Sequence, residues 1–448
     1  MNAEKILLIQ MAKLGDFIQS TPLLAKVRQK YPRAEICLAA EEPSVIESAG
    51  LSPLVDRVIE VAGAQKLPSD DYEAVFVLNS HRRAAALAAG LSSREYYGPL
   101  LSESELYFTE AQKFLLAVME TDRRLGRFNL VDVWASLIPD VKPQPLLWPV
   151  KRLKAAESSA PYKIGLQLGG RNHLRRWPVE SFLSFTKFLA ECGSRNDFSL
   201  SLYGSAPEKA LGVKFERGLA SDTEISLENL IGRTDLQSLA GHLAGLDLLV
   251  TADTGVMHLA AAVGTPVLSL FFGPAFGPET GPYGHGHLIY QTLAPCAPCL
   301  ENGHCRRRQC LEMPDPEIAA RLTLARLEGA GEISDSALPP GHRVWRTGQD
   351  KFGQQLRPFD RRLLDSEEAA ALLLTEAGRG IINPAYEPSA AVLRQVIDVY
   401  ARPEEPVKVD AGLFKKLLTK KVLNNNDPGV NFFEAALQLA ESVGFKIA

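Results

Sequence analysis

The first residues suited to chemistry follow the opening apolar run of the chain. The run KILLIQM leads into LGDFIQSTPLL, which places Asp16 just beyond the carboxyl end of an expected strand. In a parallel α/β sheet this edge carries catalytic and binding groups, and a carboxylate there can serve as a general base. Two structural interpretations stay open: Asp16 caps the next helix, or Thr21 and Pro22 begin that helix as its N-cap and first-turn proline.

A second group of reactive side chains lies in VTADTGVMHLAAAVGTP. An apolar strand ends at Asp253, and a helix is expected to begin around Thr254 and Gly255. Free N–H groups and the positive dipole end of a helix attract phosphate, and a glycine lets it approach the backbone. His258 lies on the same helical face as Thr254, so hydroxyl and imidazole can address one anion. The alternative is a tight strand-to-helix turn with a buried histidine.

Three arginines occupy the segment LGGRNHLRRWPVESF, after the first strand of the second half of the chain. Arg171, Arg175 and Arg176 precede a helix whose start is marked by Pro178. Arginines on a loop are often only solvated. If they face the same cleft as Asp253, they form a diphosphate clamp.

These three segments together fit a nucleotide-sugar substrate. Its diphosphate would lie between the arginines and a helix N-terminus, while a carboxylate of the opposite domain deprotonates the attacking hydroxyl. The arginines and the dipole offset the departing charge, so the scheme requires no metal ion or other cofactor. The expected cleft positions also contain no DxD-like acidic pair.

A cluster of cysteines forms a fourth candidate site. Cys296, Cys299, Cys305 and Cys310 are spaced C-x2-C-x5-C-x4-C, which fits a structural zinc or iron ion. Reduced thiols that bind nothing, or disulfides, are the alternatives. A bound metal would stiffen the loop at the cleft rim and take no part in transfer.

The surrounding pattern predicts an α/β protein with two doubly wound, Rossmann-like domains that face a cleft. Short apolar runs alternate with helical patterns in residues 1–150, and the alternation restarts in residues 151–330, which include the cysteine-rich loop 296–310. The proline-rich segment 141–152 is expected to connect the two domains.

The last part of the chain has a different character. From about residue 330 strand-like runs are absent, and helical patterns predict a helical accessory domain over 331–448, joined by a linker at 334–344. Its lysine-rich stretch KKLLTKK fits weak contact with an anionic membrane surface, or simply a solvated helix face.

Composition limits the function classes. At about 150 residues per domain, 448 residues make about three domains. A net charge of −4 argues against a nucleic-acid partner. The N-terminal apolar run is too short for a signal peptide, and no stretch reaches the ~20 apolar residues of a bilayer-spanning helix. We therefore expect a cytoplasmic protein, with peripheral contact at the inner membrane as its only membrane association.

The motifs LGDFIQSTP, RRWP and DTGVMHLAAAVGTPVLSLF resemble glycosyltransferase family 9, the lipopolysaccharide heptosyltransferases, over roughly residues 4–328. The resemblance implies a GT-B fold and an inverting glycosyltransferase. Such an enzyme moves heptose from an ADP-heptose-like nucleoside diphosphate sugar to an acceptor hydroxyl of a lipopolysaccharide-type glycan. Autotransporter heptosyltransferases, which pair a similar fold with cysteine-bound iron, also resemble this chain.

The same resemblance assigns roles to single residues. It implies that Asp16 is the general base, that Asp253 contacts sugar hydroxyls, and that Thr254, Gly255 and His258 hold the diphosphate. It also implies that Glu208 contacts the nucleotide ribose. Arg175 stands where these enzymes usually have a phosphate-binding lysine, which keeps the charge but changes the geometry.

The acceptor site is the least defined part. His81, Arg82 and Arg83 follow the apolar run EAVFVLN and fit either an anionic glycan or glycolipid acceptor or a solvated helix start. A protein acceptor, a nucleotide-sugar epimerase and a non-catalytic scaffold of the same fold are the alternative functions.

Overall fold

The structure is a computed structural model, and two domains account for most of what it describes. The described residues are 4–11, 13–48, 50, 54–61, 67–68, 70–79, 82–102, 105–107, 123–139, 141–142, 144–150, 162–192, 198–219, 225–299, 305, 308–329, 338–359, 371–376, 379, 408–409 and 446–447.

The first domain is built on a five-stranded parallel sheet in the order β3-β2-β1-β4-β5. Its strands are β1 (Lys5–Ile9), β2 (Glu35–Ala40), β3 (Arg57–Glu60), β4 (Asp71–Val77) and β5 (Ser92–Tyr97). Strand β1 is almost wholly buried because the sheet is covered on both faces. It pairs with β2 on one side and β4 on the other, so the loop that follows it lies at the switch point of the sheet.

Smaller elements complete this part of the chain. They are α1 (Leu14–Lys30), α2 (Pro43–Ser48), α3 (Arg82–Ala88), the hairpin β6 (Leu100–Ser102) and β7 (Glu105–Tyr107), η1 (Arg123–Leu125) and α5 (Leu130–Ala135). Residues 144–150 run without a helix or strand from α5 toward the second domain, and Leu146 and Trp148 are buried in a core cluster with residues of both domains.

Helix α1 begins earlier than either structural interpretation of its sequence predicted. Lys13 is its N-cap, so Asp16 lies in the first turn, and Pro22 lies inside the helix. The prediction that Thr21 and Pro22 start the helix is therefore wrong. Pro22 has no N–H for the carbonyl of Ile18, and the Thr21 hydroxyl donates to that oxygen at 2.7 Å instead. The helix continues because a side chain replaces the missing backbone donor.

The second domain has an eight-stranded sheet in the order β10-β9-β8-β11-β12-β13-β14-β15. Its parallel strands are β8 (Tyr162–Gln167), β9 (Phe198–Tyr203), β10 (Ser226–Asn229), β11 (Leu248–Ala252), β12 (Val267–Phe271) and β13 (Leu288–Thr292). Strand β8 lies between β9 and β11, so the loops after β8 and β11 meet at the switch point of this sheet.

The helices of the second domain connect these strands. They are η2 (His173–Arg175), α6 (Val179–Cys192), η3 (Ala206–Glu208), α7 (Lys209–Leu219), α8 (Leu236–Ala244), α9 (Gly255–Ala262), α10 (Gly277–Thr280), η4 (Gln309–Leu311) and α11 (Pro316–Leu327).

Two strands extend this sheet where none was expected. Strand β14 (His342–Asp350) pairs antiparallel with β13, and β15 (Gly353–Pro358) pairs with β14. The prediction that strands end near residue 330 is therefore wrong, and residues 342–344 of the expected linker belong to β14. Arginines interrupt the apolar pattern of β14, although Val344 and Trp345 are buried.

The rest of the expected helical accessory domain lies almost wholly outside the described residues. Within it, residues 371–376 are helical, and β16 (Lys408–Val409) pairs with β17 (Lys446–Ile447).

A buried carboxyl anchors the β14–β15 hairpin to the connecting helix. Asp132 of α5 accepts a hydrogen bond from the Tyr283 hydroxyl at 2.7 Å and one from the backbone N–H of Gln354 at 2.9 Å. Burial raises the pKa of Asp132 to about 6, against the lowering effect of these hydrogen bonds. Gly353 has a φ of +133°, and a β-carbon there would lie 2.4 Å from Asp132 Oδ1.

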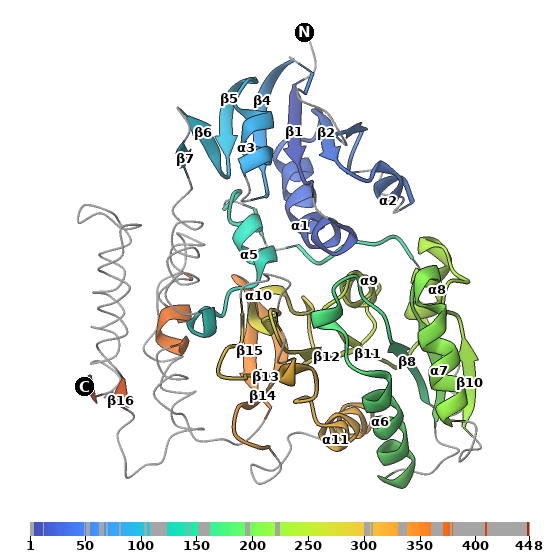
Figure 1. The fold of residues 1–448 in the computed structure, drawn as a ribbon. Coiled ribbons are helices and arrows are strands. Elements are labelled where there is room, and N and C mark those ends of the chain that lie inside the picture. Colours follow the sequence, from blue (N-terminus) through green and yellow to red (C-terminus); the bar gives the residue numbers. More distant parts are fainter. Residues whose placement is uncertain are drawn as a thin grey trace.

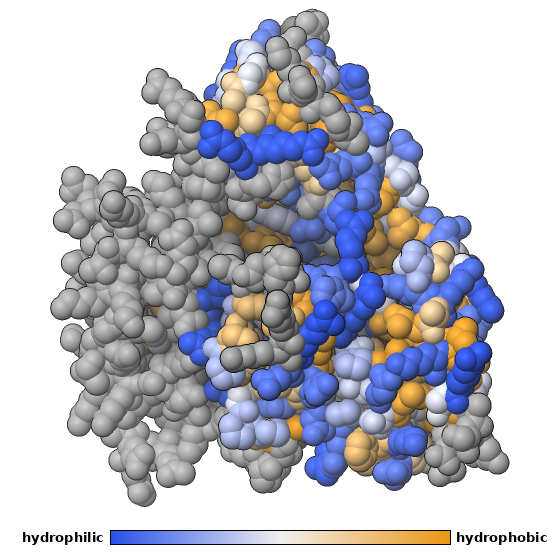
Figure 2. Space-filling view, in the orientation of Figure 1, coloured by the Kyte–Doolittle hydropathy of each residue, from blue (hydrophilic) through white to orange (hydrophobic). Residues whose placement is uncertain are grey.

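The two domains face each other across a recess. Figure 1 shows α1 at the edge of the first domain that is turned toward α9, and Figure 2 shows the surface hollowed between the domains, with hydrophilic residues beside the hollow. A single core cluster includes apolar residues of both domains, among them Phe17 and Met257. No helix in the described ranges is both long and apolar enough to cross a bilayer.

The hairpin anchor predicts a stability effect. Gly353→Ala should lower the free energy of unfolding by about 2 kcal/mol, because the new β-carbon meets the buried carboxylate in a left-handed conformation. Chemical denaturation measures the change. Gly348→Ala in the same hairpin is the control, since no atom lies within 4 Å of its β-carbon position. Equal effects of the two substitutions would contradict the anchor.

Candidate functional site

Asp16 lies in the first turn of α1, at the edge of the first domain that faces the recess. Burial raises the pKa of its carboxyl above the ordinary value. Backbone hydrogen bonds from Lys13 and from Asp16 itself, and then the charges of Arg175 and Lys13, oppose that rise. A carboxylate whose pKa is raised by partial desolvation is a stronger base than a solvated one.

A buried amide network holds the segment between β1 and the first turn of α1, where Asp16 lies. The Asn79 side chain accepts from the N–H of Met11 at 2.7 Å and donates to Gln10 Oε1 at 2.7 Å, and Gln10 in turn donates to the carbonyl of Asp16 at 3.4 Å. Sequence reasoning missed these residues. Their positions could have identified them, because Gln10 and Asn79 follow the apolar runs of β1 and β4, which are adjacent parallel strands.

The segment after β11 forms the predicted helix start. Thr254 is the N-cap of α9, with its hydroxyl accepting from the N–H of Met257 at 3.4 Å, and Gly255 is the first helical residue. This N-terminus lies directly against that of α1. A β-carbon at Gly255 would lie 3.3 Å from the nitrogen of Gly15, and one at Gly15 would lie 2.8 Å from Cδ2 of His258. Two positive helix ends therefore converge on one point of the recess.

His258 is buried in this contact. Its Nε2 lies 3.2 Å from Nε2 of Gln19, on the opposite domain. Burial lowers the pKa of His258 to about 3, so the ring is neutral at ordinary pH. The sequence predicted His258 as a site residue but gave no reason to select Gln19, which lies three residues after Asp16 on α1.

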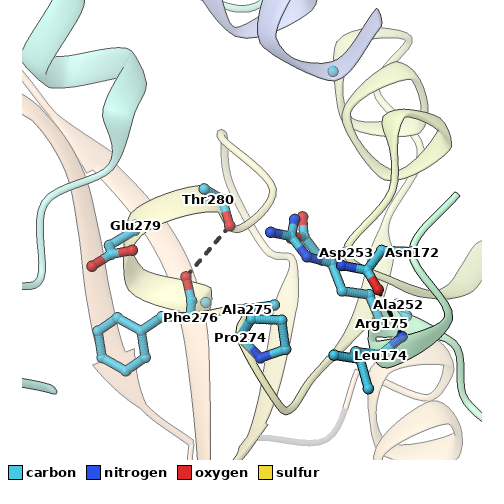
Figure 3. Close-up of polar contacts among 12 residues, drawn as sticks. Asn172, Leu174, Arg175, Ala252, Asp253, Pro274, Ala275, Phe276, Glu279 and Thr280 are labelled. Atoms are coloured by element: carbon cyan, nitrogen blue, oxygen red, sulfur yellow. Dashed lines mark hydrogen bonds and ion pairs between the residues drawn. The ribbon is translucent and has the colours of Figure 1, made fainter. Parts of the chain in front are cut away.

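Arg175 and Asp253 form an ion pair beside this point. Arg175 Nη1 lies 2.6 Å from Asp253 Oδ2, and the side chains are 32% and 7% exposed. Figure 3 shows the pair on one side and Glu279 and Thr280 of α10 on the other, with Pro274 and Ala275 below the gap. The arginine thus orients the carboxylate that ends β11.

The other two arginines of the loop after β8 point elsewhere. Arg171 is exposed and lies 3.8 Å from Glu42 of the first domain, which also pairs with Lys13 at 2.9 Å. Arg176 donates to the carbonyl of Gly170. The three guanidiniums therefore do not converge into the single clamp that the sequence suggested. Arg175 pairs with Asp253, Arg176 lies 3.7 Å from Glu208, and Arg171 faces Glu42.

Glu208 is buried in the next loop of the second domain. Its carboxylate accepts from the N–H of Gly170 at 2.6 Å and from the N–H and hydroxyl of Ser205 at 2.7 and 2.9 Å. It therefore ties the loop after β9 to the glycine loop after β8.

The expected acceptor residues lie on the first domain. Arg83 of α3 pairs with Glu41 at 2.6 Å and donates to the carbonyl of Val61 at 2.9 Å, so its guanidinium is already engaged. Arg82 is exposed at the start of α3, and His81 lies outside the described residues.

The four clustered cysteines line one cavity of about 310 Å³, together with Leu174, Gly273 and Pro274. Burial raises the pKa of the Cys299 and Cys310 thiols, and the nearby thiols raise it further. Within the described residues, no group of three or more His, Cys, Asp or Glu side chains is arranged to hold a metal ion. The sulfur donors suit zinc or iron, but their positions do not form the expected site.

A half-buried arginine links this cysteine loop to α10. Arg123 forms a bidentate pair with Glu279 of α10, at 3.1 Å from Nε and 2.5 Å from Nη2, and donates to the carbonyls of Pro274 and Cys299. The cysteine loop is therefore attached to α10, whose residues Glu279 and Thr280 appear in Figure 3.

The arrangement combines two chemical functions. Two helix N-termini and Arg175 favour a bound anion, and Asp16 supplies a base on the facing domain. Sequence reasoning placed Asp16, Arg175, Asp253, Thr254, Gly255 and His258 in one cleft, and the structure brings these residues together.

Comparisons with known proteins identify the family to which the chain belongs. The sequence profile of glycosyltransferase family 9 (heptosyltransferase) matches residues 61–309, more than half of the chain. Lipopolysaccharide heptosyltransferase 2 of Salmonella typhimurium is 27% identical over 320 residues, covering 64% of this chain and 88% of the relative. Lipopolysaccharide heptosyltransferase 1 of Pseudomonas aeruginosa is 27% identical over 367 residues, covering 72% and 92%.

The fold is also shared with a solved structure. The glycosyl transferase family 9 protein of Veillonella parvula aligns over 73% of this chain and 99% of its own, with a TM-score of 0.51 and 17% identity.

The buried histidine predicts a pH dependence of stability. Its pKa of about 3 lies below the ordinary 6.5, so unfolding takes up a proton, and stability falls as the pH drops from 6.5 toward 3. The slope from one such group is at most about 1.4 kcal/mol per pH unit.

His258→Gln should make the unfolding free energy depend less steeply on pH, measured by denaturation at several pH values. His242→Gln, which removes an exposed histidine of α8, is the control variant. An unaltered slope in His258→Gln would contradict the buried neutral state.

Proposed function

The chain belongs to glycosyltransferase family 9, and on that premise we propose that it is an inverting heptosyltransferase of the GT-B type. It would move heptose from an ADP-heptose-like donor to a hydroxyl of a lipopolysaccharide-type glycan. The named activities of its relatives from Salmonella typhimurium and Pseudomonas aeruginosa support this choice of sugar and acceptor.

The observation that carries the proposal is the position of Asp16 opposite the N-terminus of α9. In the proposed reaction Asp16 takes the proton of the acceptor hydroxyl, and the oxygen then attacks the anomeric carbon from the face opposite the leaving group. The new glycosidic bond forms as the bond from carbon to the diphosphate oxygen breaks. The nucleoside diphosphate leaves with the bonding electron pair, and the anomeric centre is inverted.

The second domain is proposed to bind the donor. The N–H groups at Gly255, the cap Thr254 and the ring of His258 would hold the diphosphate, and Arg175 would offset its charge. These groups supply the positive field without a metal ion, so we assign none to the chemistry. Asp253, oriented by Arg175, would contact sugar hydroxyls.

Further contacts are proposed at the ends of the substrate. Glu208 would accept a hydrogen bond from the nucleotide ribose, and Arg171 would meet the donor at the mouth of the cleft. On the first domain, Arg82 and Arg83, with His81, would meet an anionic acceptor. Such an acceptor is part of a glycolipid, so we propose that the protein works at the cytoplasmic face of the inner membrane.

The role of Asp16 predicts a separation of binding from chemistry. Asp16→Asn should lower kcat by ~10²–10⁴-fold, because the general base is lost, while ADP affinity stays within a few-fold. Transfer is measured with ADP-heptose and a heptose-deficient lipopolysaccharide core, and ADP binding by calorimetry. Asp71→Asn, at the exposed start of β4, is the control. Normal turnover by Asp16→Asn would remove this residue from the mechanism. If neither the variants nor the wild type transfer heptose, the proposed donor and acceptor are wrong.

We also propose that the cysteine loop takes up a structural zinc or iron ion. Four sulfur donors around one cavity support this proposal. Binding of the ion would bring the four thiols closer together than they lie in this structure. Because Arg123 joins Cys299 to α10, such an ion would stiffen the wall of the recess.

This proposal predicts the metal content of the protein. Protein purified anaerobically should carry close to one equivalent of zinc or iron, measured by elemental analysis. The double substitution Cys296→Ser and Cys299→Ser should remove it, whereas Cys192→Ser on α6, outside the cluster, should not. A mere trace of metal in the wild type would contradict the proposal.

A further inference from the structure

The side chain of Gln19 joins the base-bearing helix to the donor-binding helix. Gln19 and His258 are each 3% exposed, and their side chains meet at 3.2 Å between domains. The contact lies one helical turn from Asp16, where Gly15 leaves no room for a β-carbon beside the ring of His258. The histidine ring is therefore held by two residues of the opposite domain.

The direction of this hydrogen bond determines where the ring carries its proton. Gln19 Nε2 also lies 3.4 Å from the carbonyl of Gly15, so this atom is the amide donor. The amide N–H₂ group of Gln19 donates a hydrogen bond to the facing ring nitrogen. His258 Nε2 therefore accepts this bond with its lone pair. A neutral ring then carries its proton on Nδ1. That nitrogen is buried and, within the described part of the chain, has no hydrogen-bond partner, so a proton on it is not yet engaged.

We propose that Gln19 is a positioning residue for the transfer reaction: it fixes His258 in the Nδ1–H tautomer, so that the ring offers a proton to the anionic donor. The inference rests on the proposed function, in which His258 contacts the diphosphate. With the proton on Nε2 instead, Nδ1 would present a lone pair that repels a phosphate oxygen. Gln19 acts only through His258 and touches neither substrate.

Two substitutions separate this role from simple packing. Gln19→Met keeps the length of the side chain but removes both hydrogen-bonding groups, so the tautomer is no longer fixed. Gln19→Glu keeps a hydrogen bond but accepts from the ring, which places the proton on Nε2. ADP affinity and kcat/KM should fall about 10-fold in Gln19→Met and further, on the order of 100-fold, in Gln19→Glu. A packing role predicts the opposite order, because glutamate is the closer match in shape.

The control is another glutamine that bridges the domains. Gln237 of α8 donates to the carbonyl of Ser48 in α2, at an exposed position. Gln237→Met should leave transfer unchanged. A loss there equal to that of Gln19→Met would attribute the effect to domain contact in general and overturn the proposal.

Nitrogen-15 NMR of the histidine rings tests the tautomer directly, with the His258 signals identified by their loss in His258→Gln. Wild type should show Nδ1–H, and Gln19→Glu should show Nε2–H or the doubly protonated ring. An Nε2–H tautomer in the wild type, or activity in Gln19→Glu equal to or above that of Gln19→Met, would overturn the proposal. If wild type neither binds ADP nor transfers heptose, the proposed function fails instead, and the NMR result still decides the tautomer.

Discussion

The N-termini of α1 and α9 meet at two glycines, and the rest of the site depends on that contact. Gly15 and Gly255 approach so closely that a β-carbon on either would crowd the other helix. Two positive helix ends in contact repel each other unless negative charge lies nearby. Asp16 supplies part of that charge on one side and Asp253 on the other. A bound diphosphate would supply the rest of this negative charge, so donor binding would stabilise the contact between the two domains.

Helix α1 can hold this position because its far end is fixed. Lys26 is buried and donates to the carbonyls of Ala135 and Ile138, at the end of α5, where the helix dipole favours a cation. Helix α5 is in turn held through Asp132 by Tyr283 and by the β14–β15 hairpin. The additional strands of the second sheet therefore belong to the support of the base-bearing helix.

The sequence was most informative where local pattern and site chemistry coincide. Apolar runs that end shortly before Asp16 and directly before Asp253 located both switch points, because a strand buried on both faces leaves a continuous apolar signal. Strand β14 was missed since its half-buried arginines break that signal. Pro22 suggested a helix start because the compensating Thr21 hydroxyl is visible only in three dimensions. Gln19 could not be selected at all, because its partner is distant in sequence and its meaning comes from the contact between domains.

The measurement that tests the central claim most directly is a crystal structure of the protein with ADP. We predict that the β-phosphate lies at the N-terminus of α9, within hydrogen-bonding distance of the backbone N–H of Gly255, with the Asp16 carboxylate facing the space beyond it. A nucleotide bound away from α9, or an Asp16 turned out of the recess when ADP is bound, would contradict it.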